Sequence, residues 1–215
     1  MTFFLRETQY RDLGPAADQQ ITICGAGALG ANLAETLARM GLRQLRVIDH
    51  DRIEPHNLST QPWVQQDIGA LKARVLANAL YRAVGARVEA QASMLTAANA
   101  SALLQGSSVV VDAFDTIASR TIVAETSAAL AIACLHIALG SDGDYGCGLW
   151  GAHYTTGDPA PVRTQPVMDT CTYPLTRPLA MLVAAAAAEV LIGYLLGRRQ
   201  RNFECTLRDL RLSCA

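Results

Sequence analysis

Three glycines and an acidic residue near the start of the chain have the types and spacing of a nucleotide site. Gly25, Gly27 and Gly30 follow an apolar β-branched run in the pattern Gly-x-Gly-x-x-Gly. Asp49 ends a second apolar run, roughly 20 residues further on. Such glycines let the backbone turn tightly beside a ligand, the following helix directs free N–H groups at a phosphate, and the acid usually binds a ribose hydroxyl. The pattern predicts a bound nucleotide, and NAD, FAD and ATP remain open at this point.

Lys72 is the single lysine of a chain with seventeen arginines. Its ammonium differs from a guanidinium in being a compact point charge. Lys72 ends the run Asp67-Ile-Gly-Ala-Leu-Lys72, which we interpret as the start of a helix that continues to about Val84, with Asp67 as its N-cap. In the first turns of that helix, Lys72 lies close enough to the strand ends to reach a phosphate. The alternative is an ordinary surface lysine.

A second pair of acids, Asp112 and Asp115, follows the buried apolar run 107–111. The segment 52–66, with two prolines and no periodicity, is expected to be a loop that leaves the carboxyl end of another strand. Open α/β sheets bind their ligands at those ends. The acids are therefore candidates for the same site as Asp49, although strand-end acids without a function have the same appearance.

Cys171 is the candidate thiol. The six cysteines are scattered and include no Cys-x-x-Cys pair, which argues for a reducing compartment and against a disulfide framework or a four-cysteine zinc site. Cys171 lies in the long polar segment 154–176, where an exposed loop suits a thiolate and the nearby Arg177 would lower the thiol pKa. Cys147 and Cys214 have less support, and Cys171 itself is incidental on the alternative interpretation.

The elements that must position these residues form an α/β pattern. The run 20–51 indicates one strand–helix–strand unit, and the order of the remaining elements predicts a Rossmann-like, mostly parallel sheet with helices on both faces and an antiparallel C-terminal extension after Gly140. We expect a single domain over 1–215, with an N-terminal helix and linker at 1–19 and the long loop at 154–176. Further strands are expected over 87–92, 107–111, 132–139 and 202–212, and helices over 96–104, 117–129 and 178–197.

Composition excludes several classes of partner. The chain is 51% hydrophobic with 18 basic and 19 acidic residues, so its charge gives no case for nucleic acid or for an anionic membrane. No signal peptide is apparent, and we expect a cytoplasmic protein. The apolar segment 178–197 is long enough to span a membrane, but it contains Glu189 and many alanines, which favour packing inside the protein.

Five motifs keep their order along the chain, namely the glycine turn, Asp49-His-Asp51, Asn57-Leu-Ser-Thr-Gln61, Asp67-Ile-Gly-x-x-Lys72 and Asp112-Ala-Phe-Asp115. Together they resemble the ThiF/MoeB superfamily, the adenylation domain shared with ubiquitin-activating enzymes. The resemblance covers about 20–197. Members bind ATP with Mg²⁺ and adenylate the C-terminal glycine carboxylate of a ubiquitin-like or sulfur-carrier protein.

The resemblance assigns roles by position. Asp49 would hold the ribose, Lys72 would neutralise the phosphates, and Asp115 would bind Mg²⁺. Asn57 and Gln61 would line the phosphate and metal region. In some relatives a cysteine in the loop corresponding to that of Cys171 forms a thioester or a disulfide with the carrier, which would add Cys171 to the catalytic residues Lys72 and Asp115. The full set of implied nucleotide-binding residues is Gly25, Gly27, Ala28, Gly30, Asp49, Asp51, Asn57, Gln61, Lys72 and Thr116.

The chemistry explains these residue types. An acyl phosphate forms when a carboxylate attacks the α-phosphorus, so two anions must be brought together, which requires a cation and a metal at the phosphates. A general base is unnecessary because a carboxylate is already ionised at neutral pH.

The chain departs from the family pattern at several positions. Thr60 replaces the arginine of the Asn-Leu-x-Arg-Gln motif and removes a cation, and Thr116 replaces the asparagine after the metal-binding acid. The family's pair of Cys-x-x-Cys motifs is absent, so we expect no zinc. In homodimeric members an N-terminal arginine reaches the partner's ATP, and Arg6 or Arg11 would serve here, although the surrounding sequence matches poorly.

We therefore expect an ATP- and Mg²⁺-dependent adenylyltransferase that acts on a small carrier protein with a C-terminal glycine, as a homodimer. Two alternatives stay open. A dinucleotide-dependent oxidoreductase shares the glycine turn but gives no reason for the Lys72 motif or for Asp115. A catalytically weakened partner or scaffold subunit would keep the fold, and Thr60 is its main support.

Overall fold

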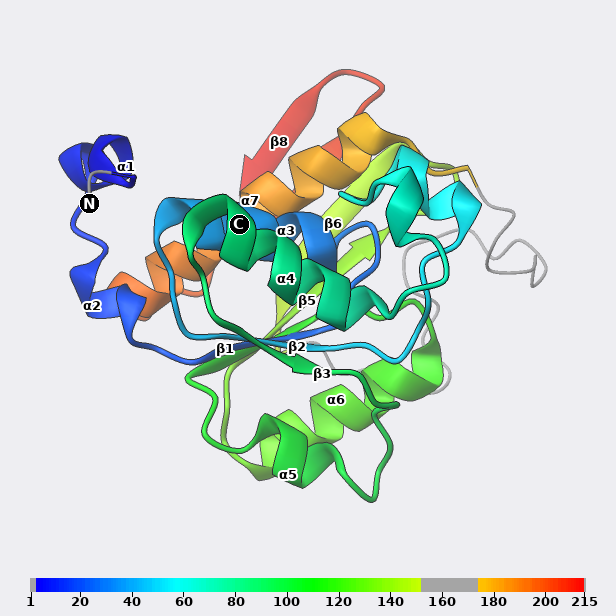
Figure 1. Cartoon of the computed structure of the whole chain (residues 1–215). Helices are drawn as coiled ribbons and strands as arrows, with labels where there is room; N and C mark the ends of the chain where they lie inside the picture. The colour runs from blue at the N-terminus through cyan, green and yellow to red at the C-terminus, as the bar shows by residue number, and fades with distance from the viewer. Residues whose placement is uncertain (1–2, 152–173, 215) are drawn as a thin grey trace.

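The computed structural model describes residues 3–151 and 174–214 (Figure 1). Strands and helices alternate over most of this length. The strands are β1 (Ile21–Cys24), β2 (Leu45–Ile48), β3 (Val88–Gln91), β4 (Val109–Asp112), β5 (Cys134–Leu139), β6 (Tyr145–Trp150), β7 (Phe203–Thr206) and β8 (Arg211–Cys214). The α-helices are α1 (Leu5–Tyr10), α2 (Gly14–Ala17), α3 (Gly30–Met40), α4 (Lys72–Val84), α5 (Ala100–Leu104), α6 (Ile117–Ala129) and α7 (Arg177–Gly197), and the short 3₁₀ helices are η1 (Pro55–Ser59) and η2 (Gln65–Asp67).

The strands form one sheet in the order β3-β2-β1-β4-β5-β6-β7-β8. The first five strands in this order are parallel to one another. The remaining pairs, β5 with β6, β6 with β7 and β7 with β8, are antiparallel. Cys24, the last residue of β1, is in register with Ile48 on one side and with Asp112 on the other. The segments after β2, β1 and β4 therefore leave the sheet at one edge, which we call the carboxyl edge. The predicted Rossmann-like sheet with an antiparallel C-terminal extension is confirmed.

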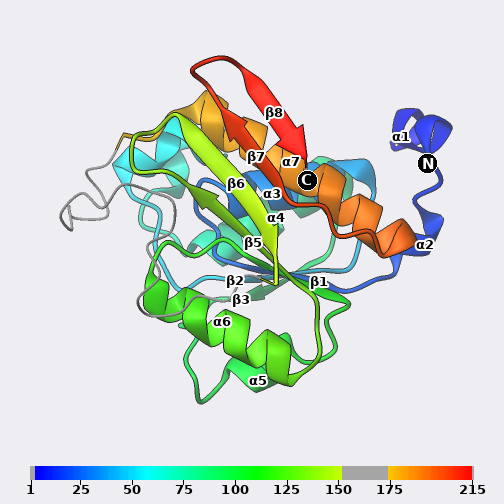
Figure 2. The ribbon, with the colours of Figure 1, turned by 180° about the vertical axis from the view of Figure 1, so that it is seen from behind.

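Helices cover both faces of the sheet (Figure 2). α3, α4 and α7 contribute to the larger apolar core on one face, whereas α5 and α6 enclose a smaller core on the other face with Cys24, Val110 and Cys134. β1 and β4 are buried along their whole length because they lie between these two cores. α2 packs against α7, and α1 lies apart from the sheet in both views. The two layers hold the central strands, and thus the carboxyl edge, in fixed positions.

α7 and β6 approach each other closely because both carry small residues. A side chain at Gly146 would overlap Val183 of α7, and one at Gly148 would overlap the ring of Phe203. By length and composition α7 would be able to cross a membrane, but most of it is buried against α3 and against β5, β6 and β7. Close packing inside the protein accounts for its apolar character.

The largest differences from the sequence-based expectation are found at three elements. The tail 202–212 was expected to be one strand, but it forms the hairpin of β7 and β8, with Leu210 at a φ of 51° in the turn between them. The helix expected over 96–104 begins only at Ala100, because the Asn99 side chain accepts the Thr96 N–H in a turn before it. α4 begins at Lys72 instead of Asp67. The last difference places Lys72 at the first position of its helix.

Candidate functional site

The glycine turn after β1 is packed tightly on one side and open on the other. Gly25 has a φ of 101°, and a Cβ there would lie 3.0 Å from the Ala113 carbonyl oxygen at the end of β4. A Cβ at Gly30 would overlap the Gly25 carbonyl oxygen. At Gly27, by contrast, nothing lies within 4 Å of the corresponding position. The turn thus presents open backbone at Gly27, at the start of α3, where a phosphate can approach the N–H groups.

Asp49 holds this turn in place. One of its carboxylate oxygens accepts the Ala26 N–H at 2.6 Å, and the other accepts the Asp51 N–H at 2.7 Å. Burial raises the pKa of Asp49, whereas the Ala26 N–H and the Lys72 ammonium act in the opposite direction. A carboxylate has about four lone-pair directions, so both oxygens can still accept a ribose hydroxyl. Asp49 therefore supports the loop and keeps the capacity predicted from sequence.

Lys72, the first residue of α4, connects the start of this helix to the segment that follows β2. Its backbone N–H donates to the Asp51 carbonyl at 2.9 Å, and its ammonium donates to the Asp51 carboxylate at 3.1 Å. The Lys72 side chain is 10% exposed, whereas that of Asp51 is 52% exposed. Asp67 is not the N-cap of α4, because it lies in η2 and its carboxylate accepts the Val64 N–H. The ammonium is held by one exposed carboxylate, which an incoming phosphate can replace.

The loop 54–63 contains the other predicted polar residues, Asn57 and Gln61, whose side chains form hydrogen bonds within the loop. The Asn57 side chain accepts the Glu54 N–H at 3.0 Å, and the Gln61 side chain accepts the Trp63 ring N–H at 2.7 Å. Both residues are buried. Asn57 and Gln61 therefore fix the conformation of the loop.

Asn32 connects this loop to the glycine turn. Its side-chain amide donates to the Ala28 carbonyl at 2.6 Å and to the Thr60 carbonyl at 2.8 Å. Thr60 is itself buried. The loop is consequently held against the start of α3, beside the open backbone at Gly27.

The first acid at the end of β4, Asp112, is fully buried. Its carboxylate accepts the Phe114 N–H at 3.1 Å and the His136 ring N–H at 2.8 Å, and Arg120 lies 3.7 Å away. Arg120 also donates to the Ile137 carbonyl at 2.8 Å. These contacts join β4, β5 and α6, so Asp112 belongs to the framework beneath the site and cannot reach a ligand.

The second acid, Asp115, is exposed, and so is its neighbour Thr116. The Thr116 hydroxyl accepts the Ser119 N–H at 3.3 Å and so begins α6. A solvent-exposed carboxylate is a ligand type that Mg²⁺ prefers, since this ion takes one or two carboxylates together with substrate phosphates and water. Asp115 fits that requirement, and Asp112 does not.

One other group of possible metal ligands occurs in the described part of the chain, namely Asp49, His50 and Asp51. Asp49 already accepts two backbone N–H groups, and Asp51 is paired with Lys72. This group therefore fits the ribose and phosphate roles better than a metal role.

The cysteines differ in exposure. Cys171 lies outside the described residues. Burial raises the pKa of four other thiols, that of Cys205 to about 11, and Cys214 alone among the described cysteines is exposed. A raised pKa leaves little thiolate at neutral pH, so these buried thiols are poor nucleophiles. The four buried or partly buried cysteines are Cys24, Cys134, Cys147 and Cys205.

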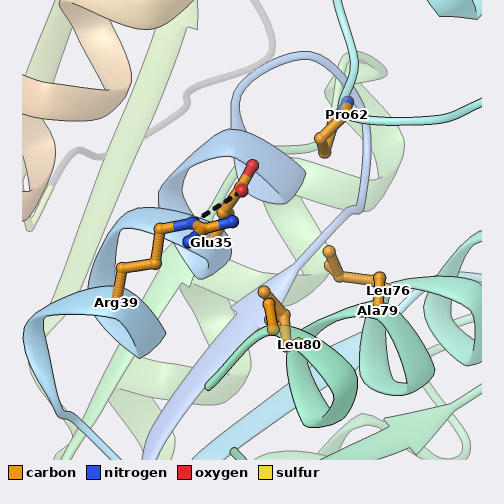
Figure 3. A pocket seen from close by; sticks show the side chains of 7 residues that line it. Glu35, Arg39, Pro62, Leu76, Ala79 and Leu80 are labelled. Carbon is orange, nitrogen blue, oxygen red and sulfur yellow. Dashed lines mark hydrogen bonds and ion pairs between the residues drawn. The ribbon is translucent and has the colours of Figure 1, made fainter. Parts of the chain in front are cut away.

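A shallow pocket lies between α3 and α4, away from these residues (Figure 3). Glu35 and Arg39 of α3 form an ion pair of 2.8 Å at its rim, and Leu76 and Leu80 of α4 line it. No residue of the five sequence motifs lines it, and Pro62 is its one lining residue from the loop 54–63. The motif residues instead converge on the carboxyl edge.

Sequence reasoning missed two features of this edge. The contacts of Asp112 with His136 and Arg120 were not predicted, although a histidine inside the apolar run 132–139 is a visible signal of a buried partner. The contact of Arg177 with the Gln61 carbonyl, at 3.4 Å, joins residues 116 positions apart and has no local signal.

Comparison with known proteins identifies relatives of this arrangement. A model described as the ThiF family matches residues 4–212. The sulfur carrier protein ThiS adenylyltransferase of Bacillus subtilis is 29% identical over 129 residues, which is 56% of this chain and 38% of the relative. The sulfur carrier protein adenylyltransferase of Thermus thermophilus is 34% identical over 113 residues, 51% of this chain and 41% of the relative. The chain thus spans about two fifths of the length of these curated relatives.

Solved structures show the same fold at low identity. The tRNA N6-threonylcarbamoyladenosine dehydratase TcdA of E. coli, determined in complex with AMP, superposes with a TM-score of 0.76 at 16% identity and covers 92% of this chain and 95% of that chain. MccB of E. coli also has a TM-score of 0.76 at 16% identity, with 98% of this chain and 67% of that chain covered.

Proposed function

The chain belongs to the ThiF family, and on that premise we propose that it is an adenylyltransferase that joins AMP to the C-terminal carboxylate of a small ubiquitin-like or sulfur-carrier protein. The observation that carries the proposal is the meeting of three features at the carboxyl edge. These are the open glycine turn held by Asp49, the ammonium of Lys72 and the exposed carboxylate of Asp115. The names of the curated relatives, which are adenylyltransferases for sulfur-carrier proteins, support it.

In the proposed reaction, a carboxylate oxygen of the carrier attacks the α-phosphorus of ATP. The new bond joins that oxygen to phosphorus, the bond from phosphorus to the bridging oxygen breaks, and pyrophosphate leaves with the electron pair. The product is an acyl adenylate. Because the attacking carboxylate is ionised, the protein needs to supply no base, and its contribution is alignment and charge stabilisation.

Each of these residues at the carboxyl edge has a separate role in the proposed reaction. Asp49 accepts the ribose hydroxyls, and the N–H groups at the start of α3 bind the α-phosphate beside Gly27. Lys72 exchanges its contact with Asp51 for the phosphates and neutralises charge as the reaction proceeds. Asp115 is the residue that would hold Mg²⁺, which supplies charge neutralisation at the phosphates when it is bound.

The test compares nucleotides and then measures the reaction. ATP with Mg²⁺ at a hundred times its Kd should stabilise the protein by about 2.7 kcal/mol, and NAD should have no comparable effect. With its carrier, a small protein that ends in Gly-Gly and is sought among the neighbouring genes, the protein should exchange labelled pyrophosphate into ATP. The same carrier with an amidated C-terminus should support no exchange.

Each alternative function has its own outcome. A larger stabilisation by NAD than by ATP with Mg²⁺ would replace the proposal with a dinucleotide-dependent oxidoreductase. Binding of the carrier without any pyrophosphate exchange would identify a scaffold or partner subunit, for which Thr60 is the sequence argument.

We propose further that Cys171 receives the activated acyl group. Its thiolate would attack the acyl carbonyl and expel AMP, which forms a thioester. The raised pKa values of the buried thiols support an assignment to a cysteine outside that group. Cys171→Ser should keep pyrophosphate exchange and lose any carrier adduct that hydroxylamine cleaves. Absence of an adduct in the wild-type protein would end the reaction at the adenylate.

The proposed enzyme acts as a homodimer in a reducing, cytoplasmic environment. The homodimer follows from the family resemblance, and the reducing environment is supported by the free cysteines of the described residues. Sedimentation equilibrium tests the first statement, since a single species at the monomer mass would contradict it.

A further inference from the structure

Arg177, the first residue of α7, lies at the same edge as the glycine turn. The Gln19 side chain, which precedes β1, donates to the Leu195 carbonyl near the end of α7 at 3.0 Å. The end of α7 is therefore at the amino end of β1, and its start is at the carboxyl end. α3 also begins at that edge, with Gly30. Figure 1 shows this orientation, with α7 running from the loop at 54–63 toward α2.

A short chain of hydrogen bonds relates Arg177 to the turn. Its guanidinium donates to the Gln61 carbonyl at 3.4 Å. The preceding carbonyl, that of Thr60, accepts the Asn32 amide, which also donates to the Ala28 carbonyl within the turn. The guanidinium is thus held beside the loop that packs against the start of α3. A contact of 3.4 Å is long for a hydrogen bond, so the group can be redirected easily.

The position of this cation is electrostatically unfavourable for the helix itself. The start of a helix carries a partial positive charge, and the first turn of α7 has no acidic residue. In the ranges 3–151 and 174–214, no carboxylate lies within ion-pair distance of Arg177, so no acidic side chain there competes with an anionic ligand for its guanidinium. Residues that break a local rule in this way are expected at functional sites.

The proposed reaction needs more positive charge than Lys72 provides. ATP carries several negative charges, and Lys72 is one ammonium that is already paired with Asp51. The Arg120 guanidinium lies in the buried group around Asp112. Thr60, next to Gln61, has no charge. Among the described residues, the exposed guanidinium of Arg177 beside the Gln61 carbonyl adds a positive charge on this side of the site.

We propose that Arg177 binds the β- and γ-phosphates of ATP and stabilises the departing pyrophosphate. This inference rests on the proposed function. Asp49 follows β2, and α7 packs over β5, β6 and β7, so Arg177 reaches the site from the side opposite the ribose. A guanidinium is suited to this contact because its planar donors bind two phosphate oxygens at once.

The experiment measures ATP and AMP binding by calorimetry in the presence of Mg²⁺, for the wild-type protein and for Arg177→Gln. The variant should bind ATP at least tenfold more weakly and AMP with unchanged affinity, because only the outer phosphates are affected. Arg177→Lys should recover part of the loss. Arg198→Gln is the matched control, since Arg198 is an exposed arginine at the other end of α7, over the ring of Tyr194.

The outcomes separate the two proposals. Unchanged ATP affinity in Arg177→Gln, with a wild-type protein that binds ATP, would overturn the role of Arg177 and leave adenylation intact. An equal loss of ATP and AMP affinity, together with a lower melting temperature, would show a structural role instead and also overturn it. A wild-type protein that binds no ATP would remove the proposed function itself.

Discussion

The ends of β2 and β4 each carry a pair of acids, and the members of each pair have different environments. At β2, Asp49 is buried and Asp51 is exposed, and at β4, Asp112 is buried and Asp115 is exposed. In both pairs the acid nearer the strand accepts backbone N–H groups from its own loop. The carboxylate of the acid further along has no backbone hydrogen bond among the described residues, and it is exposed to solvent. Sequence position relative to the strand end therefore decides which acid supports the fold.

The two buried acids nevertheless have different partners. Asp49 accepts the Ala26 N–H of the glycine turn, so it acts on the part of the chain that meets a ligand. Asp112 contacts His136 and Arg120, which belong to β5 and α6. In the proposed site, Asp49 would couple folding to nucleotide binding, whereas Asp112 would serve folding alone. The following predictions test this difference.

The largest effect is expected for Asp112→Ala. Removing one member of a buried charged group leaves the others without compensation, which typically costs about 3–5 kcal/mol. We expect a loss of unfolding free energy of this size in a urea titration. Asp115→Ala is the matched control, because its side chain is exposed, and it should change stability by less than about 0.5 kcal/mol. Equal effects of the two variants would contradict the assignment of Asp112 to the framework.

Lys72→Ala should affect the reaction more than the fold. Pyrophosphate exchange should fall at least a hundredfold, on the ~3 kcal/mol scale of one lost electrostatic donor. Lys72→Arg should restore little, because the guanidinium is broader and planar. The unfolding midpoint of both variants is measured in parallel. Wild-type exchange in Lys72→Ala would mean that the phosphates lie elsewhere.

Asp115→Asn should change the dependence on metal. An amide oxygen carries no charge and binds Mg²⁺ more weakly, so half-maximal exchange should need about tenfold more Mg²⁺, roughly 1.4 kcal/mol. The measurement is a Mg²⁺ titration at saturating ATP. Asp51→Asn is the comparison, because Asp51 is the exposed acid of the other pair. A shift caused by Asp51→Asn and not by Asp115→Asn would transfer the metal role to the end of β2.

The smallest effect concerns the pH dependence of nucleoside binding. Burial raises the pKa of Asp49, so on acidification this carboxylate gains a proton at a higher pH than an ordinary aspartate. The protonated form is a weaker acceptor, and adenosine affinity should therefore fall as the pH decreases toward the raised pKa, by a few-fold. Adenosine is the ligand of choice because it has no phosphate group whose own titration would change the affinity. Asp49→Asn should bind weakly at every pH, and a wild-type affinity that stays constant down to pH 4 would contradict this account.

Much of the fold was predictable because the sequence alternates strand and helix patterns. The apolar runs before Gly25 and Asp49 and the helix 117–129 were identified from periodicity and glycine position. The hairpin of β7 and β8 was missed because its turn, residues 207–210, contains no glycine or proline and places Leu210 at a positive φ, so that Asp209 is its one turn-favouring residue. The start of α4 was placed too early. Asp67 belongs to the 3₁₀ helix η2, where its carboxylate accepts the Val64 N–H, and residues 68–71 separate η2 from Lys72.

The site was predictable to the extent that its residues follow strand ends. Parallel strands bring their carboxyl ends to one edge, so Asp49, Lys72 and Asp115 were expected together from their order alone. The partners of Asp112 and of Gln61 were not, because His136 and Arg177 come from elements distant in sequence. Such contacts depend on how helices pack over the sheet, which local patterns do not specify.

The steric difference between Gly27 and Gly30 has a consequence for how this motif can change in evolution. Both glycines belong to one pattern, but Gly30 has no room for a methyl group, whereas the space beside Gly27 is open. A lineage that lost nucleotide binding would therefore retain glycine at position 30, since folding itself selects it, while position 27 would drift to other residues. In a descendant without activity, position 27 would therefore be substituted before position 30.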